Sequence, residues 1–240
     1  MTDDQKFEQA VRSYWSVRQA QAAKKLAEGK TDAGTRGEVT GGAHLDAMAQ
    51  LIEDAFVASG FNKESIKRSA GVELPGYYRP TKKWDLLVVE DDVLVAAIEF
   101  KSQVGPSFGN NFNNRVEEAL GNATDIWRAW EAGSFGGVRP WVGYVFFLEE
   151  HAKSTTPVRV AKSLFPADPV FEQTSYKDRY QILCQRLLRE RLYDAACFVT
   201  SSADPTTPIH QPADELSFAA FRAAIVGRAS YIKALAKQDY

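Results

Sequence analysis

The sequence predicts an α/β fold in which helices flank a mixed β-sheet. Two predominantly apolar runs, Trp141–Leu148 and Ala195–Ser201, are typical of strands buried on both faces. Two further apolar runs, at 84–89 and 93–101, stand on either side of an acidic turn and therefore predict an antiparallel hairpin. Segments with helical periodicity lie between these strands and at both ends of the chain, and this alternation indicates a sheet covered on both faces.

Two helices are predicted before the hairpin. Residues 4–28 carry apolar side chains at helical spacing, and glycines then break the pattern over 29–43. A second helix is expected from about 44 to 59, ending at Gly60. Its buried stripe consists of Leu45, Met48, Ile52 and Phe56, and its flank carries Asp46, Gln50 and Glu53.

Beyond the hairpin, three helices are predicted to alternate with the two buried strands. Asn114 is expected to cap the first helix, with Glu117 completing a capping box. The second helix is predicted over about 177–193 and the last near 214–237. Residues 61–83, which precede the hairpin, are mixed in character and interleave basic with aromatic side chains.

The composition is that of an ordinary globular protein. Of the 240 residues, 45% are hydrophobic and 25% are charged, which is enough apolar material for one sizeable core. We expect a single domain over 1–240, with an amino-terminal helix and glycine-rich connection (1–43), a core (44–202) and a closing loop and helix (203–240). The formal charge of -2 means that any surface for nucleic acid has to gather positive charge locally.

The cysteines and the lengths of the apolar runs indicate an intracellular setting. Cys184 and Cys197 are too few for a disulfide scaffold and match no zinc spacing, so both are predicted to be core residues. The amino terminus lacks the apolar stretch of a signal peptide, and no run reaches the ~20 residues that a membrane helix needs. We therefore expect a cytoplasmic protein without a membrane partner.

The predicted hairpin brings three charged residues together. Asp85 stands at the start of the first strand and Glu99 and Lys101 at the end of the second, so antiparallel pairing places them side by side. Residues 99 and 101 are two apart, and their side chains leave the same face of the sheet. Two carboxylates beside an ammonium group suit an oxygen-preferring cation such as Mg²⁺, with the lysine next to an attacking water. The alternative is a solvated ion pair at a strand end.

The segment that follows Lys101 resembles the corresponding stretch of the XhoI-type restriction endonucleases, a family of the PD-(D/E)xK nuclease superfamily. The resemblance rests on residues 99–115, Glu-Phe-Lys-Ser-Gln-Val-Gly-Pro-Ser-Phe-Gly-Asn-Asn-Phe-Asn-Asn-Arg, and extends from the Arg-Gly-Glu segment at 36–42 to at least Trp127. Trp84 stands where the superfamily name has proline. The resemblance implies a restriction-endonuclease-like core with a magnesium-dependent nuclease site.

In such a site Lys101 would orient the attacking water or help to deprotonate it. A further acid often comes from a helix ahead of the hairpin in this superfamily. We expect Glu53 to supply it, with Glu38 in the resembling segment as the competitor. The predicted cation ligands are Asp85, Glu99 and the backbone carbonyl of Phe100.

Polar residues close to Lys101 are candidates for reading DNA bases. Asparagine and glutamine can pair bidentately with adenine, and arginine with guanine. The alternative is that these asparagines serve loops and helix caps. Lys82 and Lys83 are expected to contact phosphates whatever the sequence. The predicted base-reading residues are Gln103, Asn110, Asn111, Asn113, Asn114 and Arg115.

The resemblance implies a type II restriction endonuclease that cuts double-stranded DNA at the palindrome CTCGAG and leaves 5′ overhangs. A palindrome read symmetrically implies a homodimer. A cognate DNA methyltransferase encoded alongside is implied as a functional rather than a physical partner. Two alternatives stay open at this point: a structure-selective or repair nuclease of the same superfold, and a non-catalytic DNA-binding protein.

Overall fold

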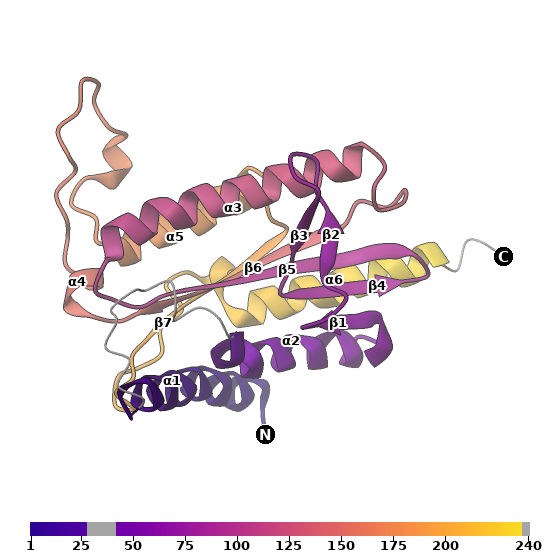
Figure 1. Cartoon of the computed structure of the whole chain (residues 1–240), viewed down its shortest axis with the longest axis horizontal. Coiled ribbons are helices and arrows are strands. Elements are labelled where there is room, and N and C mark those ends of the chain that lie inside the picture. The colour runs from indigo at the N-terminus through magenta and orange to yellow at the C-terminus, as the bar shows by residue number, and fades with distance from the viewer. Residues whose placement is uncertain (28–41, 237–240) are drawn as a thin grey trace.

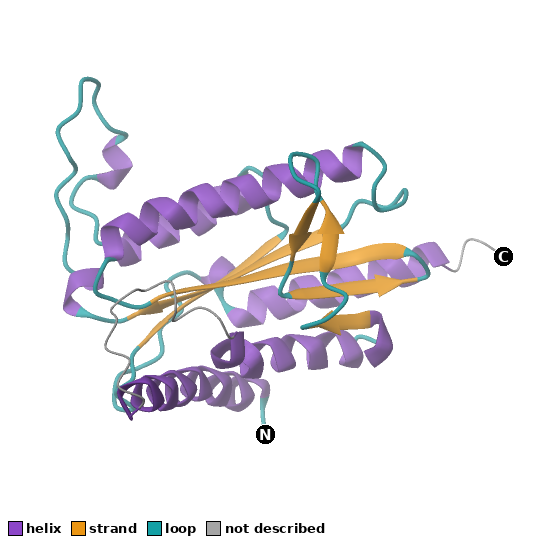
Figure 2. Ribbon diagram, in the orientation of Figure 1, coloured by secondary structure: helices purple, strands orange, loops and turns teal. Residues whose placement is uncertain are grey.

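A five-stranded mixed sheet forms the central layer of the protein, with helices on both faces (Figure 1, Figure 2). The computed structural model describes residues 1–27 and 42–236. The strand order is β1-β4-β5-β6-β7, antiparallel from β1 to β5 and parallel from β5 to β7. The predicted mixed sheet flanked by helices is therefore confirmed. The strands are β1 (Ile66–Arg68), β4 (Leu86–Glu90), β5 (Val93–Gln103), β6 (Trp141–Glu149) and β7 (Ala195–Ser201).

The helices divide between the two faces of the sheet. Helices α1 (Asp3–Ala27), α2 (Asp46–Ala58) and α6 (Phe218–Ala236) share one hydrophobic cluster with the sheet. Helices α3 (Phe108–Glu131) and α5 (Tyr176–Arg189) share the other cluster. The short elements are α4 (Ala152–Thr155) and the 3-10 turns η2 (Gly42–Leu45), η3 (Lys63–Ser65), η4 (Pro169–Phe171) and η5 (Asp214–Leu216).

From Ala96 onwards, strand β5 divides its side chains between these two clusters by simple alternation. Ala96, Ile98 and Phe100 pack into the cluster with α1, α2 and α6, whereas Ala97 packs into the cluster with α3 and α5. Glu99 shares the face of Ala97. The charged residues of β5 are thus directed towards α3 by the same rule that builds the core.

The central hairpin forms as predicted. Leu86 pairs with Ile98, and the register runs to Glu90 opposite Val93, with one irregularity between Val88 and Val89. Asp91 and Asp92 form the turn with φ of 49° and 59°. Two left-handed residues match a tight hairpin turn, and aspartate tolerates that conformation better than most residues.

A small second ribbon lies beside the hairpin. Strands β2 (Glu73–Pro75) and β3 (Thr81–Lys83) pair antiparallel and project from the sheet near the start of β4 (Figure 1). The Trp84 N–H donates to the Val72 carbonyl at 2.8 Å, which anchors the ribbon where β4 begins.

Helix α3 begins earlier than predicted. Its first residue is Phe108, and Asn114 therefore lies inside the helix instead of capping it. Aromatic packing explains the earlier start: Phe108 stacks on Tyr176, and Phe112 meets Tyr180 edge to face. These tertiary contacts with α5 outweigh the local preference of asparagine for caps and loops.

The two cysteines lie in the core of the protein, as the sequence predicts. Cys184 and Cys197 are free and fully buried, which confirms that they are core residues. Burial raises the pKa of the Cys184 thiol to about 12, so it stays protonated.

Among the helices within residues 1–27 and 42–236, none is long and apolar enough to cross a membrane.

The position of Asn114 gives a test of the start of α3. Asn114→Ala should raise the free energy of unfolding by about 0.5 kcal/mol, because alanine is the better residue at an exposed position inside a helix. If Asn114 were the cap, the same change would cost about 1 kcal/mol instead. Urea unfolding followed by circular dichroism measures the difference. Ser107→Ala is the control, because the Ser107 side chain makes no capping hydrogen bond.

Candidate active site

Asp85 and Glu99 face each other across the start of the central hairpin. Asp85 directly precedes β4, and extending the Leu86–Ile98 register by one residue places it opposite Glu99. The Asp85 N–H donates to the Ile98 carbonyl at 3.3 Å, and the Phe100 N–H donates to Asp85 Oδ2 at 2.7 Å. The juxtaposition predicted from the hairpin is therefore present.

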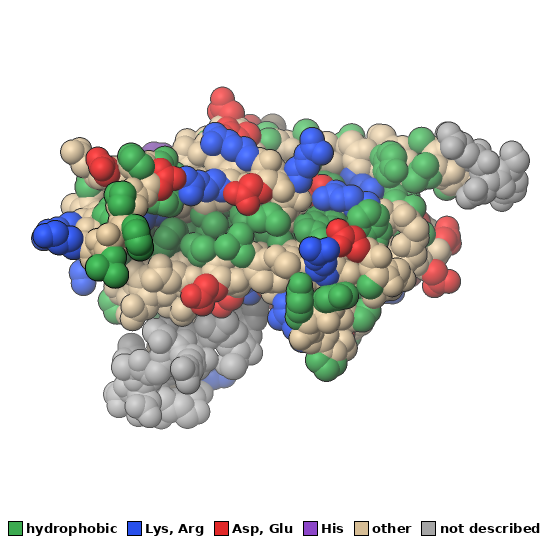
Figure 3. All heavy atoms as spheres, turned by 90° about the horizontal axis from the view of Figure 1, so that it is seen from above, with side chains coloured by type: hydrophobic (Ala, Val, Ile, Leu, Met, Phe, Trp, Pro, Cys, Tyr) green, Lys and Arg blue, Asp and Glu red, His purple; other side chains and the backbone are tan. Residues whose placement is uncertain are grey.

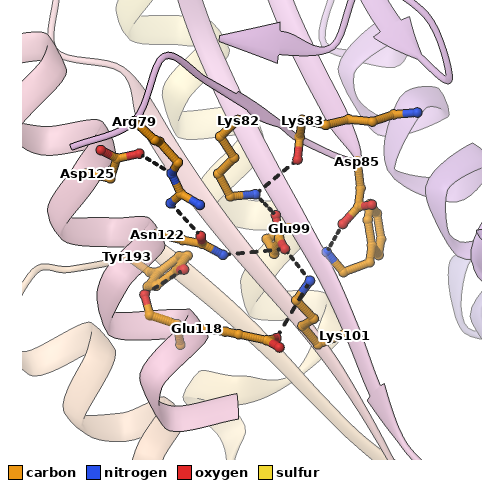
Figure 4. A network of polar contacts seen from close by, with 12 residues as sticks. Arg79, Lys82, Lys83, Asp85, Glu99, Lys101, Glu118, Asn122, Asp125 and Tyr193 are labelled. Atoms are coloured by element: carbon orange, nitrogen blue, oxygen red, sulfur yellow. Dashed lines mark hydrogen bonds and ion pairs between the residues drawn. The ribbon is translucent and has the colours of Figure 1, made fainter. Parts of the chain in front are cut away.

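Glu99 is a buried carboxylate held between two ammonium groups (Figure 4). Its residue is 3% exposed. Lys101 Nζ binds Oε1, and Lys82 Nζ donates to Oε2 at 2.6 Å. Asn122 adds a weaker donor, with Nδ2 at 3.5 Å from Oε1. Burial opposes ionisation of Glu99, but the attraction of Lys101 and Lys82 outweighs it and lowers its pKa. Glu99 is thus ionised at neutral pH.

Lys101 is charged for the complementary reason. Burial acts to lower its pKa, but the attraction of Glu99, together with Asp85 and Glu118, outweighs burial and raises it. Glu118 lies on α3 with Oε2 3.9 Å from Lys101 Nζ, and it also binds Arg115. The lysine is therefore an ammonium group directed at carboxylates on two elements.

Asp85 is the less stabilised of the two carboxylates in its ionised form. It retains access to solvent, but the protein around it still desolvates the carboxyl group. Burial, and then repulsion from Glu99, raise the pKa of Asp85 above its ordinary value. A cation placed between the two carboxylates would relieve this repulsion, so the pair suits a positively charged ligand.

Lys82 reaches this site from the β2–β3 ribbon. Its side chain is 9% exposed, and its Nζ lies 4.2 Å from the centroid of the Trp84 ring. The Nζ also donates to the Lys83 carbonyl at 3.1 Å. Lys83 is exposed, as a phosphate contact requires, whereas Lys82 is buried against Glu99. The two lysines that the sequence analysis grouped together thus have different surroundings.

The tip of the ribbon is fastened to α3 by Asp125 (Figure 4). Asp125 Oδ1 accepts the backbone N–H groups of Tyr77 and Tyr78, both at 2.9 Å, and Oδ2 accepts Arg79 Nε at 2.7 Å. Arg79 Nη2 also donates to Asn122 Oδ1 at 3.0 Å. A chain of contacts therefore runs from the ribbon tip through Asn122 to Glu99.

Asn122 and Asp125 are parts of the site that the sequence does not predict. Their partners lie 23 to 48 residues away along the chain. Both occupy one face of α3, where a polar residue in a helix otherwise indicates a solvated surface. Their near-complete burial, at 7% and 3% exposed, is the property that marks them, and it is visible only in the fold.

Glu53 lies on α2 and is buried, but its ion pairs are with residues other than Asp85, Glu99 and Lys101. Its carboxylate pairs with Arg68 at 3.1 Å and with Lys63 at 3.6 Å. Arg68 sits opposite Leu86 in the sheet, one residue from Asp85, so the Glu53 group lies at the same end of β4 as the site. The competing acid, Glu38, falls outside the described residues.

Gln103 has to be corrected as a base-reading residue. It is 2% exposed, and its Oε1 accepts a hydrogen bond from the Tyr180 hydroxyl at 2.9 Å. A side chain in that position packs between the sheet and α5 and cannot reach a base. Alternation along β5 places Gln103 on the same face of the sheet as Glu99 and Lys101, at a position that α5 covers.

The other predicted base-reading residues line the first turns of α3. Asn111 and Arg115 precede Glu118 and Asn122 at helical spacing and so share their face of the helix. Asn113 instead lines an apolar groove between α3 and α5. Asn110 and Asn114 are exposed.

Comparisons with known proteins give one consistent result. Residues 24–209 match the family described as Restriction endonuclease XhoI. The chain is 45% identical over 183 residues to the type II restriction enzyme BstVI of Geobacillus stearothermophilus, covering 74% of this chain and 81% of that enzyme. It is 41% identical over 181 residues to the type II restriction enzyme XhoI of Xanthomonas vasicola, covering 74% and 72%. It is 45% identical over 153 residues to the type II restriction enzyme AbrI of Azospirillum brasilense, covering 63% and 68%. No solved structure matches the chain significantly.

Asp125 provides a test of the ribbon attachment through pH. Burial opposes its ionisation, but the Tyr78 N–H and the Arg79 guanidinium outweigh burial and lower its pKa. The carboxylate therefore contributes stability above the ordinary aspartate pKa of about 3.9, and that stability is lost as pH falls through the lowered value. Asp125→Asn should lower the free energy of unfolding at pH 7 by about 1.5–3 kcal/mol.

Denaturant unfolding of both proteins between pH 7 and pH 3 measures this effect. The gap between wild type and Asp125→Asn should narrow in acid, and a gap that stays constant across the range would contradict the account. Glu131→Gln is the matched control on the same helix. Its exposed pair with Arg128 should contribute little to stability at any pH.

Proposed function

This chain belongs to the XhoI restriction endonuclease family, and we propose that it cuts double-stranded DNA at the palindrome CTCGAG, leaving 5′ overhangs, with Mg²⁺ as cofactor. Membership of this family makes it a site-specific deoxyribonuclease and confirms the resemblance inferred from the sequence. The mechanism rests on one observation: the buried Glu99 carboxylate faces Asp85 across the hairpin and binds Lys101. We assign these three residues to the PD-(D/E)xK pattern.

Asp85 and Glu99 fit a hard divalent cation. Both offer carboxylate oxygens, and Mg²⁺ retains several waters, so two protein carboxylates suffice. The proposed site has only two carboxylates. Within residues 1–27 and 42–236, no group of three or more His, Cys, Asp or Glu side chains is placed to hold a metal. The Phe100 carbonyl is the proposed third ligand. When bound, Mg²⁺ supplies Lewis acidity and neutralises charge that develops on the phosphate.

Lys101 acts in this proposal as an ammonium group and not as a base. Its raised pKa keeps it protonated at neutral pH, so it donates hydrogen bonds and positive charge near the reacting phosphate. Its hold on Glu99 also fixes the direction of the Glu99 carboxylate. Glu53 remains the proposed further acid, positioned by Arg68 at the same end of β4.

We propose that DNA approaches along the face of α3 that carries Asn111 and Arg115. That face continues into Glu118 and Asn122 of the site, and Lys83 on the neighbouring ribbon is free to contact phosphates. Asn110 and Asn114 flank this face. The outer side of α3 and α5 suits DNA less well, because Figure 3 shows apolar side chains along its middle. The groove between α3 and α5 is lined by apolar residues that include Val116, Leu120 and Ile182.

The proposed assembly is a homodimer, in which each copy cuts one strand of a palindromic site. We also propose that residues 1–240 form a single nuclease domain, because α1 and α6, from the two ends of the chain, pack into one core cluster with α2. A cognate methyltransferase would protect the host DNA, and a cytoplasmic location follows from that role.

The role of Lys101 is tested by substitution. Lys101→Ala should reduce cleavage by at least about 10²-fold, the low end for a group that takes part in the chemical step. DNA binding in Ca²⁺ should be largely retained, because phosphate affinity is spread over many cations. Single-turnover cleavage and a binding isotherm measure the two quantities. Lys67→Ala removes an exposed lysine from β1 and is the control; equal cleavage by the two variants would refute the assignment.

The target is tested by digestion at fixed salt. DNA carrying CTCGAG should be cut in preference to each single-base variant, with about 1–3 kcal/mol of discrimination per altered base pair. Arg115→Ala should reduce this preference, whereas Gln103→Met should leave it unchanged because Gln103 is buried. Equal cutting of all sites by the wild type would leave a nuclease without this specificity.

A further inference from the structure

Lys82 occupies a place on Glu99 that a cation would need. Glu99 has two oxygens, and the structure fills both with ammonium groups: Lys101 on Oε1 and Lys82 on Oε2. The Lys82 contact, at 2.6 Å, is short for a nitrogen–oxygen hydrogen bond. A divalent cation at Oε2 would be repelled by the Lys82 ammonium and would compete with it for that oxygen.

We propose that Lys82 is a built-in competitor for the cation, which leaves Glu99 Oε2 when a divalent cation binds and which DNA phosphate draws away. This inference rests on the proposed cation site at Asp85 and Glu99. It assigns Lys82 a role distinct from the general phosphate contact expected from the sequence. Lys82 is then a positioning residue that sets the order in which cation and DNA assemble.

The fold fixes the ribbon that carries Lys82 beside Glu99. The β2–β3 ribbon is anchored at its base by Trp84 N–H to Val72 O and at its tip by Asp125. Between these two anchors, the Lys82 side chain runs under the Trp84 ring, where its ammonium gains a cation–π contact. Two attachments and a stacking contact are more than an incidental surface ion pair would have.

The balance of charges in the site supports the same role for Lys82. Asp85 and Glu99 bring two negative charges to the site, and Lys82 and Lys101 bring two positive ones. Glu118 and Arg115, which pair with each other beside Lys101, add one charge of each sign. The site is therefore neutral as it stands and offers little attraction to a divalent cation. If the Lys82 ammonium moves to a phosphate, the site gains one net negative charge and one free carboxylate oxygen.

DNA supplies the alternative partner for Lys82. The neighbouring Lys83 is exposed at the end of the same strand, so DNA that contacts it would come close to the ribbon that carries Lys82. Binding of DNA would then favour binding of the cation, and thermodynamic linkage requires the reverse as well. The enzyme would hold its cation weakly until DNA is present.

The test measures Ca²⁺ binding to the full-length protein without DNA, by titration calorimetry at fixed ionic strength. Ca²⁺ is the probe because its looser geometry supports binding with little turnover. Lys82→Met should bind Ca²⁺ at least about fivefold more tightly than wild type, the low end for coupled sites. Lys67→Met removes the same charge from exposed β1 and should change the affinity by less than that.

The outcomes separate this inference from the proposed function. Glu99→Gln should weaken Ca²⁺ binding; if it does not, the cation site itself is wrong and the inference falls with it. If Glu99→Gln weakens binding but Lys82→Met binds Ca²⁺ as wild type does or less tightly, the competitor role is refuted and the cation site stands. A tighter affinity is a change that mere loss of structure would not produce, and Lys82→Gln repeats the test with a polar side chain.

The coupling to DNA gives a second readout. A duplex carrying CTCGAG should tighten Ca²⁺ binding by a larger factor in wild type than in Lys82→Met, because the variant has no competitor left to remove. An equal factor in both proteins would contradict the link between DNA and Lys82.

Discussion

The ionised state of Glu99 is the constraint around which the rest of the site is organised. A carboxylate that is 3% exposed loses most of its hydration, and an uncompensated buried charge costs several kcal/mol. Lys101 meets part of this cost from the same strand. Lys82, on the β2–β3 ribbon, places a second cation on the other carboxylate oxygen. The ribbon, its attachment to α3 through Asp125 and the donor on Asn122 all follow from that need.

The same arrangement also explains why the site suits a positively charged ligand. Burial, and then the Glu99 carboxylate opposite, raise the cost of ionising Asp85, and the protein tolerates both instead of replacing one carboxylate. Unfavourable electrostatics of this kind are common at functional sites, where a ligand relieves them. The lysines keep the site neutral until a cation and a phosphate arrive, so the structure is consistent with an enzyme that assembles its reactive state only on its substrate.

How far the sequence alone predicts this structure depends on the range of each contact. The hairpin and its three charged residues follow from alternation and turn chemistry within 17 residues, and the prediction succeeds there. Gln103 was misassigned because its burial depends on Tyr180, 77 residues further along the chain. The start of α3 was misplaced because aromatic contacts with α5 decide it. Lys82 was recognised as a cation, but only the fold shows which carboxylate it binds.

A crystal structure of the enzyme with Ca²⁺ and a duplex containing CTCGAG tests the central claim most directly. The account predicts a cation at about 2.3–2.6 Å from oxygens of both Asp85 and Glu99, beside the phosphate to be cut. It also predicts that Lys82 Nζ has left Glu99 for a phosphate oxygen, while Lys101 keeps its contact. A cation bound away from both carboxylates would contradict the account.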